Sequence, residues 1–451
     1  MSVGKTAGQT KNKTDKKDED VDEVDIYMSV FFDGTNNNRD NIDTYRDYKK
    51  NNHPIKAGWF GARHASAKEE YSNVARYSRI SRTDDSNKKK MYSFVYVDGI
   101  GTSTGAMDSK VPGKSFGTGR NGVNAKVSKG CRLVCEEINR LSKGFAKKSR
   151  VKLHCSVSGF SRGAAAARRF VSCIEKEQGT TSTPYRVCLK DHLGNVGMKV
   201  QSVDDIDVLF LGLFDTVSSY GMIKTIKAES DNVNELALDK IYDAKNIVQL
   251  CAGDEYRLHF SLTTVKESGN SKNYIIPGAH SDIGGGYVDP KVEKFEIVRL
   301  DRENKKDVHP LYTGFKLRDD LLNEGWFNEE QRKAGKREIP NSYSFIPYCY
   351  MRDKFIDNVD KKIFDKNVEK RFAYGEKTID KYDILKKFFN DVMAEKAFYR
   401  FEGKRMSTYI PKSEKEIADI KELRSKFLHL SANTSVGNDP TDDNIRIIVK
   451  G

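Results

Sequence analysis

The 451-residue sequence lacks the long apolar runs, cysteine pairs and metal motifs that define several classes of protein. Its longest apolar segment, around Val208–Phe214, falls far below the ~20 residues that a membrane-spanning helix needs, which excludes an integral membrane protein. The seven cysteines are scattered and none forms a C-x-x-C pair, so neither a zinc ribbon nor a dithiol redox site is indicated. The sequence also contains no His-Glu-x-x-His metal motif and no internal repeat. We expect no bound metal and mostly reduced core cysteines.

The composition is polar and basic, with 37% hydrophobic residues, 32% charged residues and a formal net charge of +13. A lysine-rich surface that keeps the protein in solution explains this charge, and attraction to a nucleic acid or an anionic lipid surface is the alternative. No zinc-finger or RNP-type signature accompanies the basic residues. We therefore expect no nucleic-acid partner.

Charge and apolar patterning divide the chain into three regions. Residues 1–25 hold five Lys and seven acidic residues without a hydrophobic stretch, which predicts a disordered charged tail and no secretory signal. Residues 26–300 alternate apolar segments with turn residues, which indicates an α/β core, and the motifs described below make it the candidate catalytic core. Residues 301–451 form a charged, mainly helical cap or accessory region, in which the strand-like Ile445–Val449 could return to the core.

The apolar spacing predicts an α/β fold. Strands are expected at Ile26–Phe32, Met91–Val97, Val151–Ser158, Asp207–Phe214, Arg257–Thr264 and Tyr274–Pro277. Helices are expected at Tyr71–Ile80, Val123–Leu141, Ala164–Ile174, Val233–Leu250, Phe315–Trp326 and Ile379–Phe398. Because strands alternate with helices and end in Gly/Asp-rich turns, we predict a mostly parallel sheet with its loops gathered at the carboxyl edge.

The motif Gly-Phe-Ser-Arg-Gly at 159–163 lies between a predicted strand and an Ala-rich helix. This strand–turn–helix context is typical of a nucleophile elbow, a strained turn that points a serine hydroxyl out of the sheet. Small residues are needed at Gly159 and Gly163, where side chains would collide with neighbouring backbone. Ser161 is therefore the candidate nucleophile, and a tight Gly/Ser turn without chemistry is the alternative reading.

A serine nucleophile needs a base and an orienting acid, which in hydrolases of this topology follow in the order Ser, Asp, His. Asp215 directly follows an apolar strand, where a carboxylate is costly unless it has a partner. His280 follows another strand within a glycine-rich turn and satisfies the order. His429 and His309 are the rival bases.

An oxyanion hole needs two backbone N–H donors. In an elbow the residue after the nucleophile supplies one, which is Arg162 here. The second donor is expected from the loop after the first strand, at Gly34 or Thr35. We expect the neighbouring Asp33 to cap that turn rather than to take part in catalysis.

Six blocks of the sequence, in order over about residues 26–290, resemble one family. They are FDGTN at 32–36, SNVAR at 72–76, VDGIGT at 97–102, GFSRGA at 159–164, FDTV at 214–217 and PGAHSDIGGGY at 277–287. This set is similar to the α/β-hydrolase family that includes the first group of type VI secretion phospholipase effectors. Little of the chain after Tyr287 takes part in the resemblance.

The resemblance implies a Ser161–Asp215–His280 triad and phospholipase A activity on glycerophospholipid esters in the envelope of a rival bacterium. It also implies a VgrG-type spike or adaptor, a cognate immunity protein, and delivery by the secretion needle to the target-cell periplasm and membrane. No cofactor is expected, whereas calcium dependence, headgroup choice and sn-1 or sn-2 preference are left open. The alternatives are an esterase or thioesterase for a soluble acyl substrate, and a catalytically silent binding or delivery module.

Overall fold

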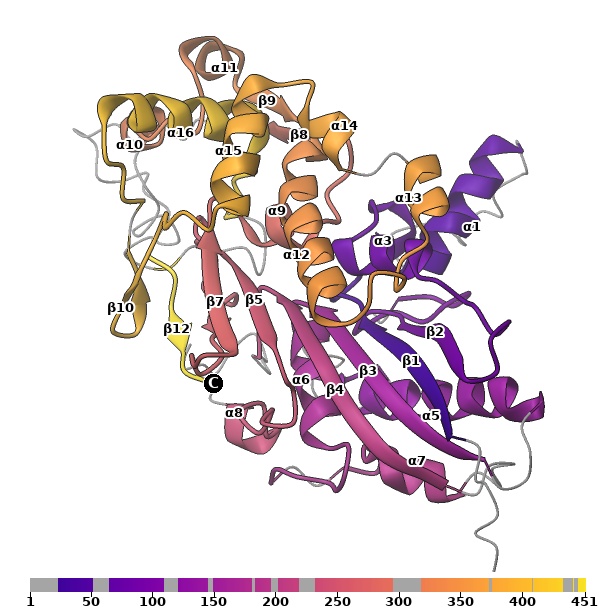
Figure 1. Ribbon diagram of the computed structural model, residues 1–451. Coiled ribbons are helices and arrows are strands. Elements are labelled where there is room, and N and C mark those ends of the chain that lie inside the picture. The colour runs from indigo at the N-terminus through magenta and orange to yellow at the C-terminus, as the bar shows by residue number, and fades with distance from the viewer. Residues whose placement is uncertain are drawn as a thin grey trace, which may run out of the picture.

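The computed structural model describes residues 23–51, 65–108, 121–144, 149–180, 183–195, 202–218, 232–294, 318–372, 375–407, 409–432, 441 and 445–451. In this part of the chain a central sheet of six parallel strands has the order β2-β1-β3-β4-β5-β7 (Figure 1). Its strands are β1 (Glu23–Phe32), β2 (Lys90–Val97), β3 (Arg150–Phe160), β4 (Ser202–Phe214), β5 (Ile247–Ala252) and β7 (Ser271–Ile276). The predicted α/β architecture is confirmed.

Helices cover both faces of the sheet (Figure 1). On one face, α5 (Val123–Leu141) and α6 (Arg162–Ser172) pack on the central strands, whereas α3 (Asn73–Ile80) and α12 (Phe345–Asn358) pack on the other. Successive side chains of a strand point to opposite faces, so each buried strand contributes to both apolar layers. In β4, for example, Leu211 and Leu213 lie in the layer with α5 and α6, and Phe210 and Phe214 lie in the layer with α12.

The remaining elements are short or lie at the edges of the sheet. The helices are α1 (Arg39–Lys50), α2 (Ala65–Lys68), α7 (Leu189–Asn195), α8 (Asn232–Glu235), α9 (His280–Gly284), α10 (Arg318–Asn323), α11 (Glu329–Ala334), α13 (Lys366–Phe372), α14 (Glu376–Ile379), α15 (Asp383–Met393) and α16 (Glu414–Phe427). The 3₁₀ helices are η2 (Ser142–Gly144) and η4 (Asn341–Ser344). The additional strands are β6 (Leu262–Thr263), β8 (Lys291–Lys294), β9 (Lys336–Ile339), β10 (Phe401–Glu402), β11 (Arg405–Met406) and β12 (Ile448–Val449).

The predicted helix Val233–Leu250 is wrong. The chain leaves α8 at Glu235, and Ala237 has a left-handed φ of 51°, a conformation that a continuing right-handed helix cannot hold. Its last residues instead form the buried strand β5, between β4 and β7. The apolar spacing that suggested a helix reflects burial among several elements rather than one helical face.

The predicted division of the chain into three regions can be compared with the structure at its two ends. The first strand begins at Glu23, so three residues of the predicted tail belong to the sheet. The predicted division at residue 300 falls among residues 295–317, outside the described part, and stays a prediction. The predicted strand Ile445–Val449 contains β12, which pairs in parallel with β6 and follows β7 in space (Figure 1). Arg446, two residues before β12, contacts Asp215 and Ala252 and so brings this segment to the carboxyl ends of β4 and β5.

The register of the sheet brings the predicted site loops to one edge. Phe32 at the end of β1 is level with Gly159 in β3, and Phe160 is level with Phe214 at the end of β4. Phe214 is in turn level with Leu250 in β5. Because the strands are parallel, the loops that follow them all begin at this carboxyl edge.

Candidate active site

Ser161 occupies a strained turn between β3 and α6. Its backbone has φ 59° and ψ −125°, a positive φ that a residue with a side chain rarely adopts. The neighbouring glycines permit the turn: a Cβ on Gly159 would lie 2.3 Å from the carbonyl oxygen of Gly163, and one on Gly163 would lie 2.2 Å from that of Asp33. The strand–turn–helix context expected for a nucleophile elbow is therefore present.

Asp215 lies beside this turn, directly after β4. Ser161 N–H donates to the carbonyl oxygen of Phe214 at 2.9 Å, and Val217 N–H donates to that of Ser161 at 3.3 Å, so hydrogen bonds to the elbow flank Asp215 on both sides. The Asp215 carboxylate is fully buried, and its Oδ1 accepts the N–H of Ala252 at 2.8 Å. Its position is thus fixed from both β4 and the end of β5.

His280, the first residue of α9, meets Asp215. Its Nδ1 lies 2.5 Å from Asp215 Oδ2, and only 4% of the residue is exposed. The rings of Phe160 and Phe260 pack against the imidazole at centroid distances of 4.6 Å and 4.9 Å. Among the described residues no hydrogen bond joins Ser161 Oγ to His280, and such bonds are often long before substrate binds.

Burial and neighbouring charges shift the pKa values of Asp215 and His280 in opposite directions. Burial alone would raise the pKa of Asp215, but Arg446 and His280 outweigh it and hold that pKa below its usual value. Burial lowers the pKa of His280 and outweighs the opposing effect of Asp215. The combination favours an ionised carboxylate beside a neutral imidazole, which is the state that a general base requires.

Arg446, which sequence reasoning missed, contacts the same carboxylate. Its Nη1 donates to Asp215 Oδ1 at 2.6 Å and its Nη2 donates to Oδ2 at 2.7 Å. The two residues are 231 positions apart, and Arg446 is a single basic residue within the otherwise apolar segment Ile445–Val449. The only sequence signal near it was the predicted strand Ile445–Val449.

The loop after β1 lies against the elbow, as expected for the second oxyanion donor. Arg162 Nε donates to Thr35 Oγ1 at 2.7 Å, which ties the residue after the nucleophile to this loop. Gly34 N–H already donates to Asp33 Oδ1 at 2.8 Å. Among the described residues none accepts a hydrogen bond from Thr35 N–H, so Thr35 is better placed than Gly34 to be the second donor.

Asp33 holds the shape of this loop. Besides Gly34 N–H, its carboxylate accepts hydrogen bonds from Ser72 Oγ and Tyr96 Oη, both at 2.5 Å. Burial raises the pKa of Asp33 to about 6, against the lowering effect of these donors. These bonds join the loop after β1 to Ser72, the N-cap of α3, and to Tyr96 of β2, which matches the expected capping role.

The rival base His429 belongs to a separate pair. Its Nδ1 lies 2.6 Å from Asp282 Oδ1, and its ring stacks on Tyr287 at 3.9 Å. Asp282 Oδ2 also accepts the N–H of Ala279, which fixes the start of α9. His429 thus supports the helix that carries His280. The other rival, His309, lies outside the described residues.

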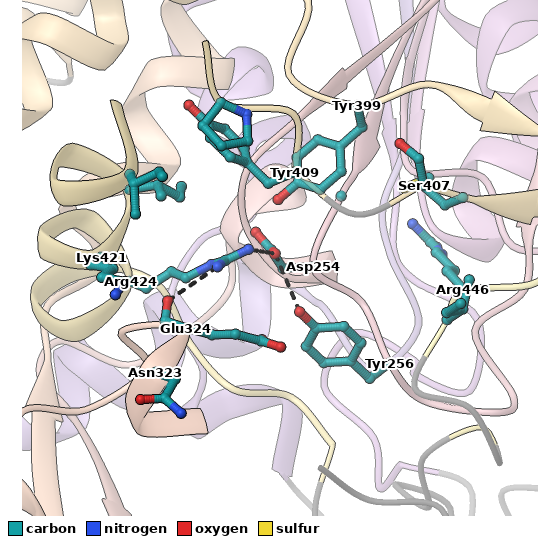
Figure 2. A pocket seen from close by; sticks show the side chains of 16 residues that line it. Asp254, Tyr256, Asn323, Glu324, Tyr399, Ser407, Tyr409, Lys421, Arg424 and Arg446 are labelled. Atoms are coloured by element: carbon teal, nitrogen blue, oxygen red, sulfur yellow. Dashed lines mark hydrogen bonds and ion pairs between the residues drawn. The ribbon is translucent and has the colours of Figure 1, made fainter. Parts of the chain in front are cut away.

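A cavity of about 230 Å³ lies alongside Arg446, between the loop after β5 and α16 (Figure 2). Its wall includes Tyr256, Tyr399 and a buried ion pair in which Arg424 Nη2 lies 2.7 Å from Asp254 Oδ1. Arg424 and Arg446, both from the C-terminal region, therefore neutralise two carboxylates that follow neighbouring strands.

The described residues contain neither a cluster of metal ligands nor a helix that could span a membrane. No group of three or more His, Cys, Asp or Glu side chains that could hold a metal ion occurs in the described part of the chain. Within the same residues, no helix combines the length and the apolar character needed to cross a bilayer. All seven cysteines are buried and unbridged.

The parallel sheet, its crossover helices and the serine turn at its carboxyl edge define an α/β-hydrolase-like protein. Residues 28–302 match the family described as "T6SS, Phospholipase effector Tle1-like, catalytic domain". Because that match spans more than half of the chain, the protein belongs to the Tle1-like phospholipase effector family of the type VI secretion system. The resemblance stated from the sequence motifs is confirmed.

A solved structure agrees with this fold. The chain is similar to the Tle1 effector bound to the VgrG spike from the type 6 secretion system, with 19% identity, a TM-score of 0.58, and coverage of 100% of this chain and 99% of that one. An uncharacterized protein from Pseudomonas aeruginosa is more distant, with 16% identity, a TM-score of 0.38, and coverage of 83% of this chain and 51% of the other. A comparison with curated proteins found no match. At 19% identity the Tle1 likeness bears on the fold alone.

Proposed function

We propose that the protein is a serine hydrolase that cleaves acyl esters of glycerophospholipids, with phospholipase A specificity and an antibacterial role. The observation that carries this proposal is the buried Asp215–His280 pair, joined at 2.5 Å, beside the strained turn at Ser161. Membership of the Tle1-like family supplies the lipid substrate class. Delivery by the type VI system, through a VgrG-type spike or adaptor, and protection of the producing cell by an immunity protein belong to the same proposal.

In the proposed reaction, Ser161 Oγ attacks the ester carbonyl carbon while His280 Nε2 accepts its proton and Asp215 orients the imidazole. The N–H groups of Arg162 and Thr35 would stabilise the oxyanion. His280 then returns the proton to the departing lysophospholipid oxygen. A water molecule activated by the same imidazole cleaves the acyl-enzyme and releases a fatty acid.

The direct test is the product mixture from purified protein and defined phospholipid vesicles, followed by mass spectrometry. We expect one fatty acid and one lysophospholipid per cleaved lipid, and neither product with the Ser161→Ala variant. Release of a phosphorylated headgroup instead would contradict the phospholipase A assignment. Rates on a short-chain ester that do not increase above its micelle threshold would favour a soluble esterase, and an absence of products from every ester would favour a silent module.

The pH dependence of the reaction should report His280. The imidazole must be neutral to accept the Ser161 proton. Activity should therefore fall as the pH drops through the pKa of His280 and should reach its full value above that pKa. Burial lowers that pKa from its ordinary value of 6.5, so we expect the acid limb of kcat/KM to titrate below pH 6.5. Rates on a soluble p-nitrophenyl ester, with circular dichroism at each pH to exclude unfolding, measure it. An acid limb above that value would contradict the expectation.

A further inference from the structure

We propose that Arg446, from the C-terminal segment, is a positioning residue whose fixed positive charge keeps the Asp215–His280 pair in its working form, an ionised carboxylate beside a neutral imidazole. This inference rests on the proposed hydrolase function. It makes the segment that leads into β12 a functional part of a site whose proposed nucleophile, base and acid all lie in residues 161–280.

Arg446 is held too firmly for its contact with Asp215 to be incidental. Besides the two bonds to the carboxylate, its Nη1 donates to the carbonyl oxygen of Ala252 and its Nε donates to that of Phe260, both at 2.9 Å. Four directed bonds orient a guanidinium that is only 2% exposed. This planar, bidentate geometry is one that arginine provides and lysine does not.

The backbone around Arg446 is fixed as well. The carbonyl oxygen of Arg446 accepts the N–H of Met406 at 3.2 Å, and that of Ile447 accepts the N–H of Leu262 at 2.9 Å. The next two residues form β12, which pairs with β6. Because the backbone on both sides of the side chain is bonded to the core, the guanidinium keeps its place beside Asp215 as long as this segment stays docked.

The other charged groups that face His280 form a separate compensated pair. Glu255 accepts the backbone N–H of His280 at 3.2 Å and is paired with Arg257 at 2.9 Å, and Ser431 Oγ also donates to it. Asp282, on the same helix as His280, is bound to His429. Glu255 and Arg257 carry opposite charges, so the net charge beside the imidazole depends on Asp215 and Arg446.

Removing the Arg446 charge should change the protonation of the pair in one direction. With Arg446 present, adding a proton to Asp215–His280 creates an excess positive charge in a buried site, which is unfavourable. Without it, the ionised carboxylate and neutral imidazole leave an uncompensated buried negative charge, and binding a proton neutralises it. The pair should then keep its proton to higher pH, where His280 cannot act as a base.

The test compares Arg446→Met and Arg446→Gln with Arg424→Met, a matched control. Arg424 is also buried, comes from the same C-terminal region and pairs with a buried Asp at 2.7 Å, but it does not contact Asp215 or His280. The pKa of His280 is measured by NMR titration of histidine-labelled protein, assigned by the signal lost in His280→Gln. The acid limb of kcat/KM on a p-nitrophenyl ester is measured in parallel, and thermal unfolding reports the fold.

We expect both Arg446 variants to raise the His280 pKa and the acid limb by about 1–3 pH units, the usual effect of a neighbouring unit charge, and Arg424→Met to move neither. Arg446→Gln removes the charge but keeps hydrogen-bond donors, so the same measurements are made on it if Arg446→Met does not fold. An unchanged His280 pKa in a folded Arg446 variant, or an equal shift in Arg424→Met, would overturn the proposal. If the wild-type protein shows no hydrolase activity but Arg446→Met still raises the His280 pKa, the proposed function is refuted and this inference is supported.

Discussion

Ser161→Ala should reduce kcat for ester hydrolysis by about 10⁴- to 10⁶-fold, the largest effect that we expect from any single substitution. The variant removes the only atom that forms the acyl-enzyme bond in the proposed reaction, so what remains is catalysis by the oxyanion donors and by binding alone. The proposed nucleophile is nearly buried at 3% exposure, and alanine removes one oxygen without adding volume. The fold should therefore survive, and single-turnover assays on defined phospholipids measure the loss.

Ser158→Ala is the matched control. Ser158 lies three residues earlier, in β3, and is fully buried, and its hydroxyl has no hydrogen-bond partner among the described residues. Loss of that hydroxyl should leave both kcat and thermal stability close to the wild-type values. If Ser161→Ala retained more than about a hundredth of the wild-type kcat, a serine nucleophile at this position would be refuted. Equal losses in the two variants would indicate damage to the strand rather than to the chemistry.

Asp215→Asn should reduce kcat by about 10⁴-fold, because an amide can present its own N–H to His280 Nδ1 and favour the tautomer that cannot accept the serine proton. It should also destabilise the protein, since the Arg446 guanidinium would stay buried without a counter-charge, at a cost of about 3 kcal/mol or more. Steady-state kinetics and denaturant unfolding measure the two effects separately.

A double variant distinguishes the loss of activity from the loss of stability. Asp215→Asn combined with Arg446→Met removes both charges, so it should recover much of the lost free energy of unfolding and none of the lost activity. Asp254→Asn is the control, because Asp254 forms the corresponding buried pair with Arg424 after the neighbouring strand. It should lose stability while retaining far more activity than Asp215→Asn. A fall in kcat of less than about tenfold in Asp215→Asn would contradict the assigned role.

The predictions that succeeded rest on signals contained within a few neighbouring residues. The helix Val123–Leu141 is observed with the predicted bounds, since its apolar residues recur at helical spacing along one face. The serine turn was identifiable because a strand, two glycines and an Ala-rich helix follow one another directly. The order of Asp215 and His280 after their strands, and the parallel topology that gathers those loops, likewise follow from the order of residues along the chain.

The helix prediction that failed and the pairings that the sequence left open depended on packing partners far away in the sequence. Val233–Leu250 has helical spacing, but Ile247–Ala252 is needed as a strand between β4 and β7, and pairing on both sides outweighs the local preference. The sequence favoured His280 over His429 by its place after a strand, but it could not show which carboxylate each imidazole meets. The structure brings His280 to Asp215 and His429 to Asp282.

The sequence by itself determined the fold class, the family and the candidate nucleophile, base and acid, because motif spacing and strand–loop order are local properties of the chain. Only the tertiary structure decided which histidine meets Asp215, that Gly34 N–H is already bound, and that Arg446 neutralises the buried carboxylate from 231 positions away. The physical reason is that burying a charge requires a counter-charge in space, and nothing in the local sequence around either residue specifies its partner. The C-terminal region, which the sequence predicted to be a cap or accessory region, supplies that partner through Arg446.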